Sequence, residues 1–419
     1  MGIFRRPASG VPAGDAIPFA AGEEYHLFFL TSPACTKHYP ERVRTSWFHA
    51  RSRDLVDWEE LPVALTPGSG DEPDSDGVWT GSVIERDDRY HLFYTGHRID
   101  SATPQTICRA TSEDLVHFVK DRSNPILAPD TARYESVDWR DPYVFWNEEE
   151  RCYWMLIAAR LADGPRWRRG CIALATSPDL ELWSLEDQPL YAPGTTLCPE
   201  CPEMFRLEHS WYLVYSRFSE QAQTMYRVAK APRGPWRVSD GDALDGRRWY
   251  AAKSVPELRK SARVFFGWVH ERVDASDEGA WQWGGDFGVP REVCAEREGL
   301  LTARLPEAHQ ARFARELAYV VGGPNSAPRE ESPRSLALEA YGALDYRFMD
   351  TDTRDYLFEC RIAPQGRVGG FGLLFRVNDD LGGYVFAFDP IQSTVSLVRW
   401  PQPLDKFWGR IGRSRRGAA

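Results

Sequence analysis

The sequence has no surplus of positive charge. Its 419 residues include 51 Lys and Arg against 61 Asp and Glu, which gives a net charge of −10 at pH 7. A protein that binds the phosphate backbone of nucleic acid needs clustered basic residues, so we expect no nucleic acid among its partners. Long apolar runs are missing as well, and residues 1–19 lack the apolar stretch that a signal peptide requires. We therefore expect no membrane partner and a cytoplasmic location.

Cysteines are few and scattered, without the dense spacing of a disulfide framework. Cys198 and Cys201 form one CxxC pair, but no second CxxC and no spaced His pair completes a metal set. No helical segment follows the pair, as a thioredoxin-like site would need. We expect free thiols throughout, no bound metal and no organic cofactor. The eight cysteines are Cys35, Cys108, Cys152, Cys171, Cys198, Cys201, Cys294 and Cys360.

Long helical patterns are scarce too, and short runs rich in aromatic and β-branched residues recur in their place. Such runs are typical of β-strands. They read EEYHLFFL, RYHLFYTG, CYWMLIAA, SWYLVYSR and ARVFFGWV, at intervals of several tens of residues. The expected fold class is therefore all-β.

A second pattern follows the first three of these runs. The phrases SRDLVDW, TSEDLVHF and TSPDLELW end at Trp58, Phe118 and Trp183, and a decayed fourth copy, KAPRGPW, ends at Trp236. In each full copy a small residue and an Asp predict a turn, the Leu is expected in the core, and the aromatic residue closes the next strand. One supersecondary unit used repeatedly predicts a five-bladed β-propeller over residues 1–305, with four-stranded blades around a central channel.

The remainder of the chain predicts a second, smaller domain. Residues 306–332 combine a helical candidate, Pro306 to Val320, with a stretch rich in Gly, Pro and Ser, and we expect a connector helix and linker. Strand-like runs with polar turns follow in residues 333–419 and indicate a short or incomplete β-sandwich. So few strands leave unpaired edges. Either the sandwich is cut short or another chain closes it, in which case the protein is a homo-oligomer.

Three short acidic segments stand at the edges of strand-like runs: GDAIPF with Asp15, WRDPYVF with Asp141 and ECPEMF with Glu200. Cleavage of a glycosidic bond needs one carboxyl group that donates a proton and a second carboxylate that meets the cationic sugar carbon. Taken singly, Asp15 also suits a turn, Asp141 an ion pair with Arg140, and Glu200 a charged loop in which Glu203 is a rival. Together the segments predict an enzyme that cleaves a carbohydrate substrate.

WRDPYVF and ECPEMF belong to a longer series that resembles glycoside hydrolase family 32. In order, it reads YHLFFL, WFHARSRDLVDWEELPVAL, VWTGSVIE, WRDPYVF, ECPEMF and GVPREV. The resemblance runs from about residue 15 to residue 306 and implies a five-bladed propeller with a C-terminal β-sandwich. It also implies a retaining β-fructofuranosidase that forms a covalent fructosyl-enzyme and acts on sucrose or short fructans. Asp15 would be the nucleophile, Asp141 the transition-state stabiliser and Glu200 the general acid/base.

The resemblance also suggests residues that line the sugar pocket. Arg140 would hold Asp141 and a sugar hydroxyl together through its fork of donors, and Glu203 would contact the sugar. Each tryptophan of the set suits the core of a blade equally well. The remaining pocket candidates are Trp47, Trp79, Ser82 and Trp283.

Several positions depart from the usual pattern of this family. The opening segment GDAIPF keeps the acid and loses its Asn and Trp neighbours, Leu30 replaces a Gln, and Lys253 replaces a neutral amide. Because these groups contact fructose or shape the leaving-group side, the preferred sugar stays open. Lys253, Arg168 and Arg169 are candidates to bind a phosphorylated sugar, although isolated basic residues are usually solvated.

Three other functions stay open at this stage. A related five-bladed glycosidase would act on arabinofuranosides or xylosides, often with inversion, and its two carboxyl groups would stand farther apart to admit a water. A fructosyltransferase differs from a hydrolase only in the nucleophile that attacks the intermediate. A non-catalytic carbohydrate-binding module would have no use for three acids in a channel, where an unused buried acid costs stability.

Overall fold

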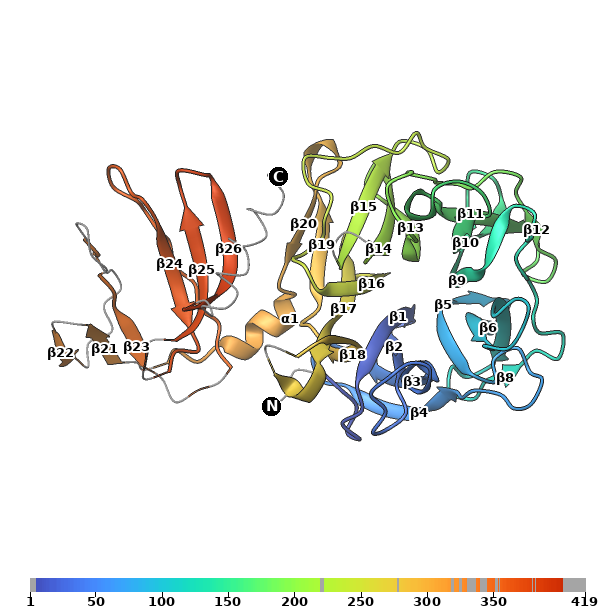
Figure 1. The fold of residues 1–419 in the computed structure, drawn as a ribbon, viewed down its shortest axis with the longest axis horizontal. Helices are drawn as coiled ribbons and strands as arrows, with labels where there is room; N and C mark the ends of the chain where they lie inside the picture. The colour runs from blue at the N-terminus through green and yellow to red at the C-terminus, as the bar shows by residue number, and fades with distance from the viewer. Residues whose placement is uncertain are drawn as a thin grey trace, which may run out of the picture. The chain divides into compact units, whose positions relative to one another are not determined.

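The computed structural model describes residues 5–218, 222–276, 279–317, 320–323, 326–329, 337–339, 345–350, 353, 355–378, 380 and 382–401. The chain divides into two compact units, Met1–Glu316 and Leu317–Ala419. Strands make up nearly all of the regular structure (Figure 1). In the described part of the chain, no helix has the length and apolar character needed to cross a membrane.

The first unit is a five-bladed β-propeller, in which each blade begins with a strand next to the centre of the ring (Figure 1). The first blade contains β1 (Ala13–Ala21), β2 (Glu24–Thr31), β3 (Ser46–Ser52) and β4 (Glu59–Leu65). The second contains β5 (Gly77–Arg86), β6 (Arg89–His97), β7 (Gln105–Ser112) and β8 (Val119–Lys120). The third contains β9 (Tyr134–Asn147), β10 (Cys152–Leu161), β11 (Gly170–Ser177) and β12 (Ser184–Leu185).

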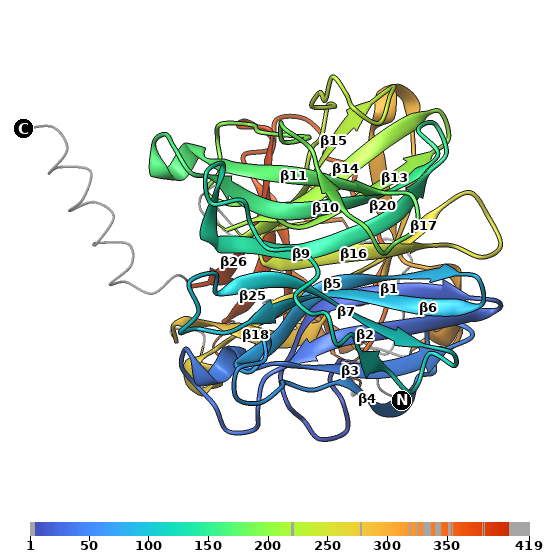
Figure 2. The ribbon, with the colours of Figure 1, turned by 90° about the vertical axis from the view of Figure 1, so that its right-hand side faces the viewer.

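The last two blades are less regular. The fourth contains β13 (Glu200–Leu207), β14 (Ser210–Arg217) and β15 (Gln223–Ala229). The fifth contains β16 (Trp249–Pro256), β17 (Arg263–Arg272), β18 (Trp281–Phe287), β19 (Arg291–Ala295) and β20 (Leu301–Arg304). Figure 2 shows the strands of one blade, β9, β10 and β11, running side by side. Short 3-10 turns lie between strands: η1 (Glu41–Val43), η2 (Arg166–Arg168), η3 (Val273–Ala275) and η4 (Arg297–Gly299).

The two ends of the propeller sequence meet and close the ring. β18 pairs with β1 through Ala13 and Gly285. Before β1, the carbonyl of Arg5 accepts a hydrogen bond of 3.0 Å from the backbone N–H of Phe287. The Arg6 guanidinium forms an ion pair of 2.7 Å with Asp286. These contacts join segments about 280 residues apart in sequence, so β1 and the acid that it carries are fixed by the last blade as well as by the first.

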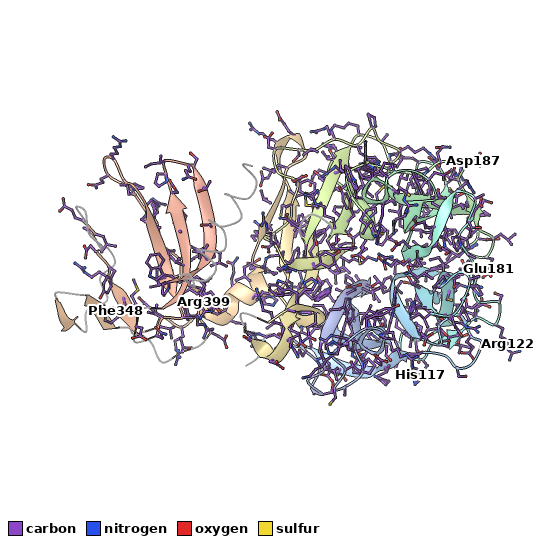
Figure 3. All side chains as sticks on the ribbon, in the orientation of Figure 1. His117, Arg122, Glu181, Asp187, Phe348 and Arg399 are labelled. Carbon is purple, nitrogen blue, oxygen red and sulfur yellow. The ribbon has the colours of Figure 1, made fainter. Side chains whose placement is uncertain are left out.

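The repeated phrase forms the same hydrogen-bonded turn in the first three blades. In the second blade the Asp114 carboxylate accepts hydrogen bonds of 2.8 Å from the backbone N–H groups of Val116 and His117. Leu115 takes a positive φ of 60° and is buried. Leu55 and Leu180 repeat both features, with φ of 69° and 68°. Figure 3 shows His117 and Glu181, which belong to two of these turns, at the outer rim of the propeller.

The aromatic residue that ends each phrase packs on the second strand of the preceding blade. The rings meet edge to face, with centroids 5.5–5.8 Å apart, the geometry that aromatic pairs favour. A repeated contact of this kind fixes the angle between neighbouring blades. The pairs are Trp58 with Phe266, Phe118 with Phe28, and Trp183 with Phe93.

Each of the five inner strands carries a β-bulge. In β1, β5, β13 and β16 the pairing register shifts between Ala13 and Ala16, Trp79 and Gly81, Glu200 and Glu203, and Tyr250 and Lys253, respectively. In β9 the register shift lies opposite Leu156 and Ala158 of β10. At three of these bulges a residue other than glycine has a left-handed φ: 58° at Asp141, 49° at Cys201 and 48° at Ala251. Such residues cost on the order of 1 kcal/mol each and gather where a side chain must be re-aimed. The bulges mark the centre of the ring as the place to look for a site.

The second unit contains two three-stranded antiparallel sheets in its described part. One has the order β22 (Ser326–Arg329), β21 (Val320–Gly323) and β23 (Phe348–Asp350), and the other has β24 (Phe371–Phe375), β25 (Gly383–Asp389) and β26 (Thr394–Trp400). Large apolar residues such as Phe386, Leu397 and Trp400 are 41–57% exposed. The described strands of this unit are few, as expected from the sequence, and the β-sandwich itself stays a prediction.

The helix predicted from Pro306 to Val320 is much shorter. The α-helix α1 covers Glu307–Gln310, a 3-10 turn η5 covers Ala311–Phe313, and Val320 already lies in β21. Only His309 of these two short helices is buried, and an isolated helix with no apolar face to pack is marginal in water. Strands β21 and β22 also occupy part of the stretch 306–332 expected as connector and linker, of which residues 318, 319, 324, 325 and 330–332 lie outside the described part.

Candidate active site

The three predicted acids converge at the bulges of three inner strands. Cys201 links them, since it follows Glu200 in β13 and contacts the other two acids. Its backbone N–H donates a hydrogen bond of 2.8 Å to Asp141, and its sulfur lies 3.6 Å from an oxygen of Asp15. Residues 15, 141 and 200 are therefore neighbours in space although they lie far apart in sequence.

The Asp15 carboxylate is held by two donors from different blades. The Thr80 hydroxyl donates a hydrogen bond of 2.5 Å to Oδ2, and the Trp268 indole N–H donates one of 2.9 Å to Oδ1. Burial and the neighbouring Asp141 raise the pKa of Asp15 to about 6, against the effect of these donors. Above that pH the group is an ionised, oriented carboxylate, which suits a nucleophile.

The Glu200 carboxyl group is held between Arg140 and Tyr250. Nη2 of Arg140 donates a hydrogen bond of 2.7 Å to Oε1, and the Tyr250 hydroxyl donates one to Oε2. Burial, with a further contribution from Asp141, raises the pKa of Glu200 to about 7 in spite of both donors. A carboxyl group with this pKa is protonated in a large fraction of molecules near neutrality, as a general acid must be.

Asp141 is the most deeply buried of the three acids, with 4% of its side chain exposed. Its backbone N–H donates a hydrogen bond of 2.8 Å to the Thr95 hydroxyl, and its carboxylate accepts one from Cys201. Nε of Arg140 lies 3.8 Å from Oδ2. The carboxylate thus stays beside the other two acids and adds negative charge between them.

Arg140 compensates for part of this negative charge. Its guanidinium also pairs with Asp138 and donates to Gln105 at 3.1 Å. A buried arginine shared by three carboxylates holds the planar groups in fixed orientations. Arg140 lies beside Asp141, and its predicted role toward a sugar hydroxyl stays a prediction. The stronger contact to Glu200 was not foreseen.

Of the predicted pocket residues, Trp47 and Ser82 lie in the core. Trp47 is fully buried, and its indole N–H donates to the carbonyl of Trp79 at 2.9 Å. The Ser82 hydroxyl accepts a hydrogen bond of 2.9 Å from the backbone N–H of Val144, which ties β5 to β9. Trp79 is partly exposed and stacks on His97 at 4.1 Å. Trp47 and Ser82 therefore position the inner strands and have little surface to offer a ligand.

Trp283 lies against the segment that carries the nucleophile candidate. A Cβ atom on Gly14 would approach its ring to 2.4 Å, so glycine is required at position 14. The ring also lies 5.6 Å from that of Trp268, the donor to Asp15. The structure thus brings the predicted Trp283 next to Asp15.

Glu203 is bound by Ser254 and Arg263 rather than by the residues that hold the three acids. It is completely buried, and its carboxylate accepts a hydrogen bond of 2.7 Å from the backbone N–H of Ser254 and lies 3.5 Å from Arg263. A side chain without exposed surface has none to give to a sugar, so Glu203 is not placed to contact one. Lys253 is likewise buried, and its ammonium group donates a hydrogen bond of 2.7 Å to the carbonyl of Gly81.

Four side chains of the site were not predicted: Thr80, Thr95, Trp268 and Tyr250. The first two lie in strands β5 and β6, beside predicted residues, and the last two lie in the fifth blade. The only signal for Tyr250 was its place in the segment RRWYAAKSV, three residues before Lys253.

All eight cysteines are free thiols. Cys198 lies 3.5 Å from Arg140, and Cys201 lies between Asp15 and Asp141. Within the described ranges, no group of three or more His, Cys, Asp and Glu side chains is placed to hold a metal ion. The CxxC pair thus belongs to the acid cluster.

The fold and the cluster define a class of protein: a five-bladed propeller with three carboxyl groups gathered at its inner strands. Residues 16–303 match the model of the "Glycosyl hydrolases family 32 N-terminal domain". The chain belongs to this family.

Curated relatives include a raffinose invertase from Escherichia coli, 30% identical over 67% of this chain and 59% of that protein. A fructan 1-exohydrolase from Aegilops speltoides is 25% identical over 80% of this chain and 62% of that protein. The chain thus spans about three fifths of the length of these relatives.

Solved structures share the fold at lower identity. The sucrose-6-phosphate hydrolase from Lactobacillus gasseri superposes with a TM-score of 0.66 and 20% identity, covering 94% of this chain and 76% of that chain. Fructan 1-exohydrolase IIa from Cichorium intybus superposes with a TM-score of 0.61 and 22% identity, covering 78% of this chain and 66% of that one.

Proposed function

We propose that the chain is a retaining glycoside hydrolase that cleaves β-fructofuranosides, such as sucrose or short fructans. Asp15 attacks the anomeric carbon and forms a covalent fructosyl-enzyme, while Glu200 protonates the departing oxygen. Glu200, now ionised, then takes a proton from the water that releases fructose. Asp141 stabilises the positive charge that develops on the sugar in both steps.

The observation that carries this proposal is that Asp15 and Glu200, which lie in one cluster, differ in their hydrogen-bond donors and in their pKa values. Asp15 accepts hydrogen bonds from two neutral donors and titrates near pH 6, whereas burial raises the pKa of Glu200 to about 7. Between these values one carboxyl group is ionised and the other protonated, which is the division of labour that glycoside cleavage needs.

The choice of fructosides is supported by the relatives. Their names include raffinose invertase, fructan 1-exohydrolase and sucrose-6-phosphate hydrolase, and one solved structure with the same fold is a β-fructofuranosidase crystallised with sucrose. A carbohydrate is therefore the proposed ligand. The cytoplasmic location and a homo-oligomer closed through the sandwich stay predictions.

The test is hydrolysis of sucrose and of short fructans, followed by NMR from the first minutes of reaction. We expect fructose to appear first as the β anomer, and we expect the substitutions Asp15→Asn and Glu200→Gln to lower kcat by about a thousandfold or more. A first product of inverted configuration would remove the nucleophile role of Asp15. Equal, slow turnover by the wild type and both variants would contradict catalysis at this site.

A further inference from the structure

Lys253 is a buried cation that the proposed mechanism does not use. It lies in β16, the inner strand of the fifth blade, and is 2% exposed. Its ammonium group donates a hydrogen bond of 2.7 Å to the carbonyl of Gly81 in β5 and lies 5.4 Å from the centre of the Tyr143 ring in β9. Because β5 and β9 belong to the second and third blades, the side chain extends across the inner strands of the ring (Figure 1). A buried charge is costly unless its surroundings compensate for it.

A role in binding a phosphorylated sugar does not suit Lys253, because almost none of its surface is exposed. The other basic candidates from the sequence are bound to backbone carbonyls. Arg168 donates a hydrogen bond of 3.0 Å to the carbonyl of Gly194, and Arg169 donates one of 2.7 Å to that of Ala162. The purpose of Lys253 is therefore to be sought among the residues that surround it.

The carbonyl that Lys253 binds follows the bulge of β5. The pairing of β5 with β6 shifts between Trp79 and Gly81, so Thr80 is the extra residue of the bulge. The Thr80 hydroxyl donates the hydrogen bond of 2.5 Å to Asp15. Lys253 thus fixes the backbone next to the residue that holds the proposed nucleophile.

The charge of Lys253 also acts within the acid cluster. Cys201, whose sulfur lies 3.6 Å from an oxygen of Asp15, lies close enough to respond to it. Burial and the negative charges of Asp141 and Asp15 raise the pKa of the Cys201 thiol, and Lys253 opposes them. Burial and Asp141 also raise the pKa of Asp15. A cation at this place favours the ionised form of Asp15.

The charged and titratable groups around Asp15 and Lys253 come from several strands. They are Arg140, Asp141 and Tyr143 of β9, Glu200, Cys201 and Glu203 of β13, Tyr250 of β16 and Arg263 of β17. The two guanidinium groups of this set are bound to carboxylates of β13, at 2.7 Å from Glu200 and 3.5 Å from Glu203. The ammonium group of Lys253 is bound to a neutral carbonyl, so its charge is left to act on the cluster.

We propose that Lys253 is a positioning residue for the nucleophile: its ammonium group holds the bulge that carries Thr80 and supplies positive charge that keeps Asp15 ionised. This inference rests on the proposed function. The charge acts strongly at this depth because little water is present to screen it.

Two substitutions separate the charge from the hydrogen bond. Lys253→Gln removes the charge and keeps a donor, and we expect it to fold because the family usually has a neutral amide at this position. Lys253→Met has a similar length and removes both. Lys120→Gln is the matched control, because Lys120 in β8 also donates a hydrogen bond of 2.7 Å to a backbone carbonyl, that of Thr66.

The first test is the titration of Asp15 by 13C NMR of protein labelled at the aspartate carboxyl carbons, with Asp15→Asn to assign the signal. Loss of a nearby positive charge disfavours the ionised acid, so both Lys253 variants should raise the midpoint by about 0.5 to 1 pH unit. The acidic limb of kcat/KM for sucrose should move equally, which lowers kcat/KM at pH 6 about two- to fivefold. Lys120→Gln should move neither.

The second test is a double-mutant cycle that examines the link through Thr80. Thr80→Val should lower kcat/KM about tenfold in the wild-type background, because Asp15 loses a donor. In the Lys253→Met background, where the bulge is no longer held, the same substitution should cost about threefold or less.

The outcomes separate this inference from the proposed function. The NMR titration needs no turnover, so a failure to cleave sucrose or short fructans would count against the proposed function alone. An Asp15 midpoint that is unchanged in both Lys253 variants, or additive losses in the cycle, would overturn the role of Lys253. A lower kcat/KM with an unshifted pH profile, or loss of the fold in both variants by circular dichroism, would show that Lys253 is only structural and would also overturn it.

Discussion

The Tyr250 hydroxyl donates a hydrogen bond to Glu200, and the Tyr250 ring meets the ring of Trp268 edge to face, at an angle of 89°. Trp268 in turn donates its indole N–H to Asp15. Two aromatic residues on neighbouring strands of the fifth blade therefore orient the carboxyl groups of the first and fourth blades. The nucleophile and the acid of the proposed mechanism share one rigid support, so a change at either aromatic residue is expected to affect both.

The first prediction concerns the pH dependence of the wild-type reaction. Activity requires Asp15 ionised and Glu200 protonated, and their pKa values are raised to about 6 and about 7. We expect kcat/KM for sucrose to follow a bell with its maximum between these values, falling below pH 6 as Asp15 gains a proton and above pH 7 as Glu200 loses one. Because the acids interact, the apparent pKa value of each limb is a property of the cluster as a whole and not of one residue. A profile that is flat from pH 5 to 8 would contradict the assignment.

The second prediction concerns Tyr250→Phe. In the wild type, the hydrogen bond from Tyr250 favours the ionised form of Glu200. Its loss in the variant should raise the pKa of Glu200 and move the alkaline limb of the profile to higher pH. At the wild-type optimum, kcat should fall by about tenfold, because Glu200 loses an orienting partner. Tyr94→Phe is the control, since Tyr94 is buried and donates a hydrogen bond of 2.9 Å to Asp74. A profile of Tyr250→Phe that matches the control would show that Tyr250 is only structural.

The third prediction concerns stability. In the folded state the pKa of Asp15 is raised from 3.8 to about 6 by burial and by Asp141, so the folded protein prefers the protonated acid. That preference stabilises the fold below pH 3.8 and is lost as the pH rises through 6, a difference of roughly 3 kcal/mol. Asp15→Asn removes the charge, and its Tm should rise relative to wild type between pH 4 and 7. The control Asp187→Asn, at the exposed rim (Figure 3), should show no such trend.

The fourth prediction tests the repeated turn away from the site. Asp114 accepts two backbone hydrogen bonds of 2.8 Å that keep Leu115 buried with a positive φ. Asp114→Ala should lower the free energy of unfolding by about 1 kcal/mol, measured by urea titration, because two backbone N–H donors of the exposed turn lose their shared acceptor, Oδ1 of Asp114. Activity of the folded protein should not change. Glu113→Ala, at a neighbouring exposed surface position, should cost less than half as much.

The sequence predicted the features that repeat and the features that carry charge. The phrase with Asp114 and its copies specifies a turn through local chemistry, and a repeated turn specifies blades. Asp15, Asp141 and Glu200 stand out because acids beside apolar strands need a purpose. The family resemblance then placed them together, as the contacts around Cys201 show.

Tertiary packing decides the features that the sequence did not predict. Whether Trp47 or Ser82 faces the channel or the core depends on the bulges, each of which adds one residue and reverses the alternation of the strand. The bulge between Glu200 and Glu203 separates an acid that the site uses from one that Ser254 binds. Tyr250 reaches Glu200 only because the fourth and fifth blades are neighbours. The helical candidate at residues 306–320 forms only the short helices α1 and η5 in its described part, where His309 alone is buried.

The most direct test of the central claim is a search for the covalent intermediate. The Glu200→Gln variant, treated with a fructosyl fluoride whose leaving group needs no proton, should accumulate the fructosyl-enzyme because the base for its hydrolysis is gone. We predict that mass spectrometry of the quenched variant finds one fructosyl unit on the peptide that contains Asp15, and none after Asp15→Asn. An adduct on another residue, or turnover of the fluoride with inversion and no adduct, would contradict the account.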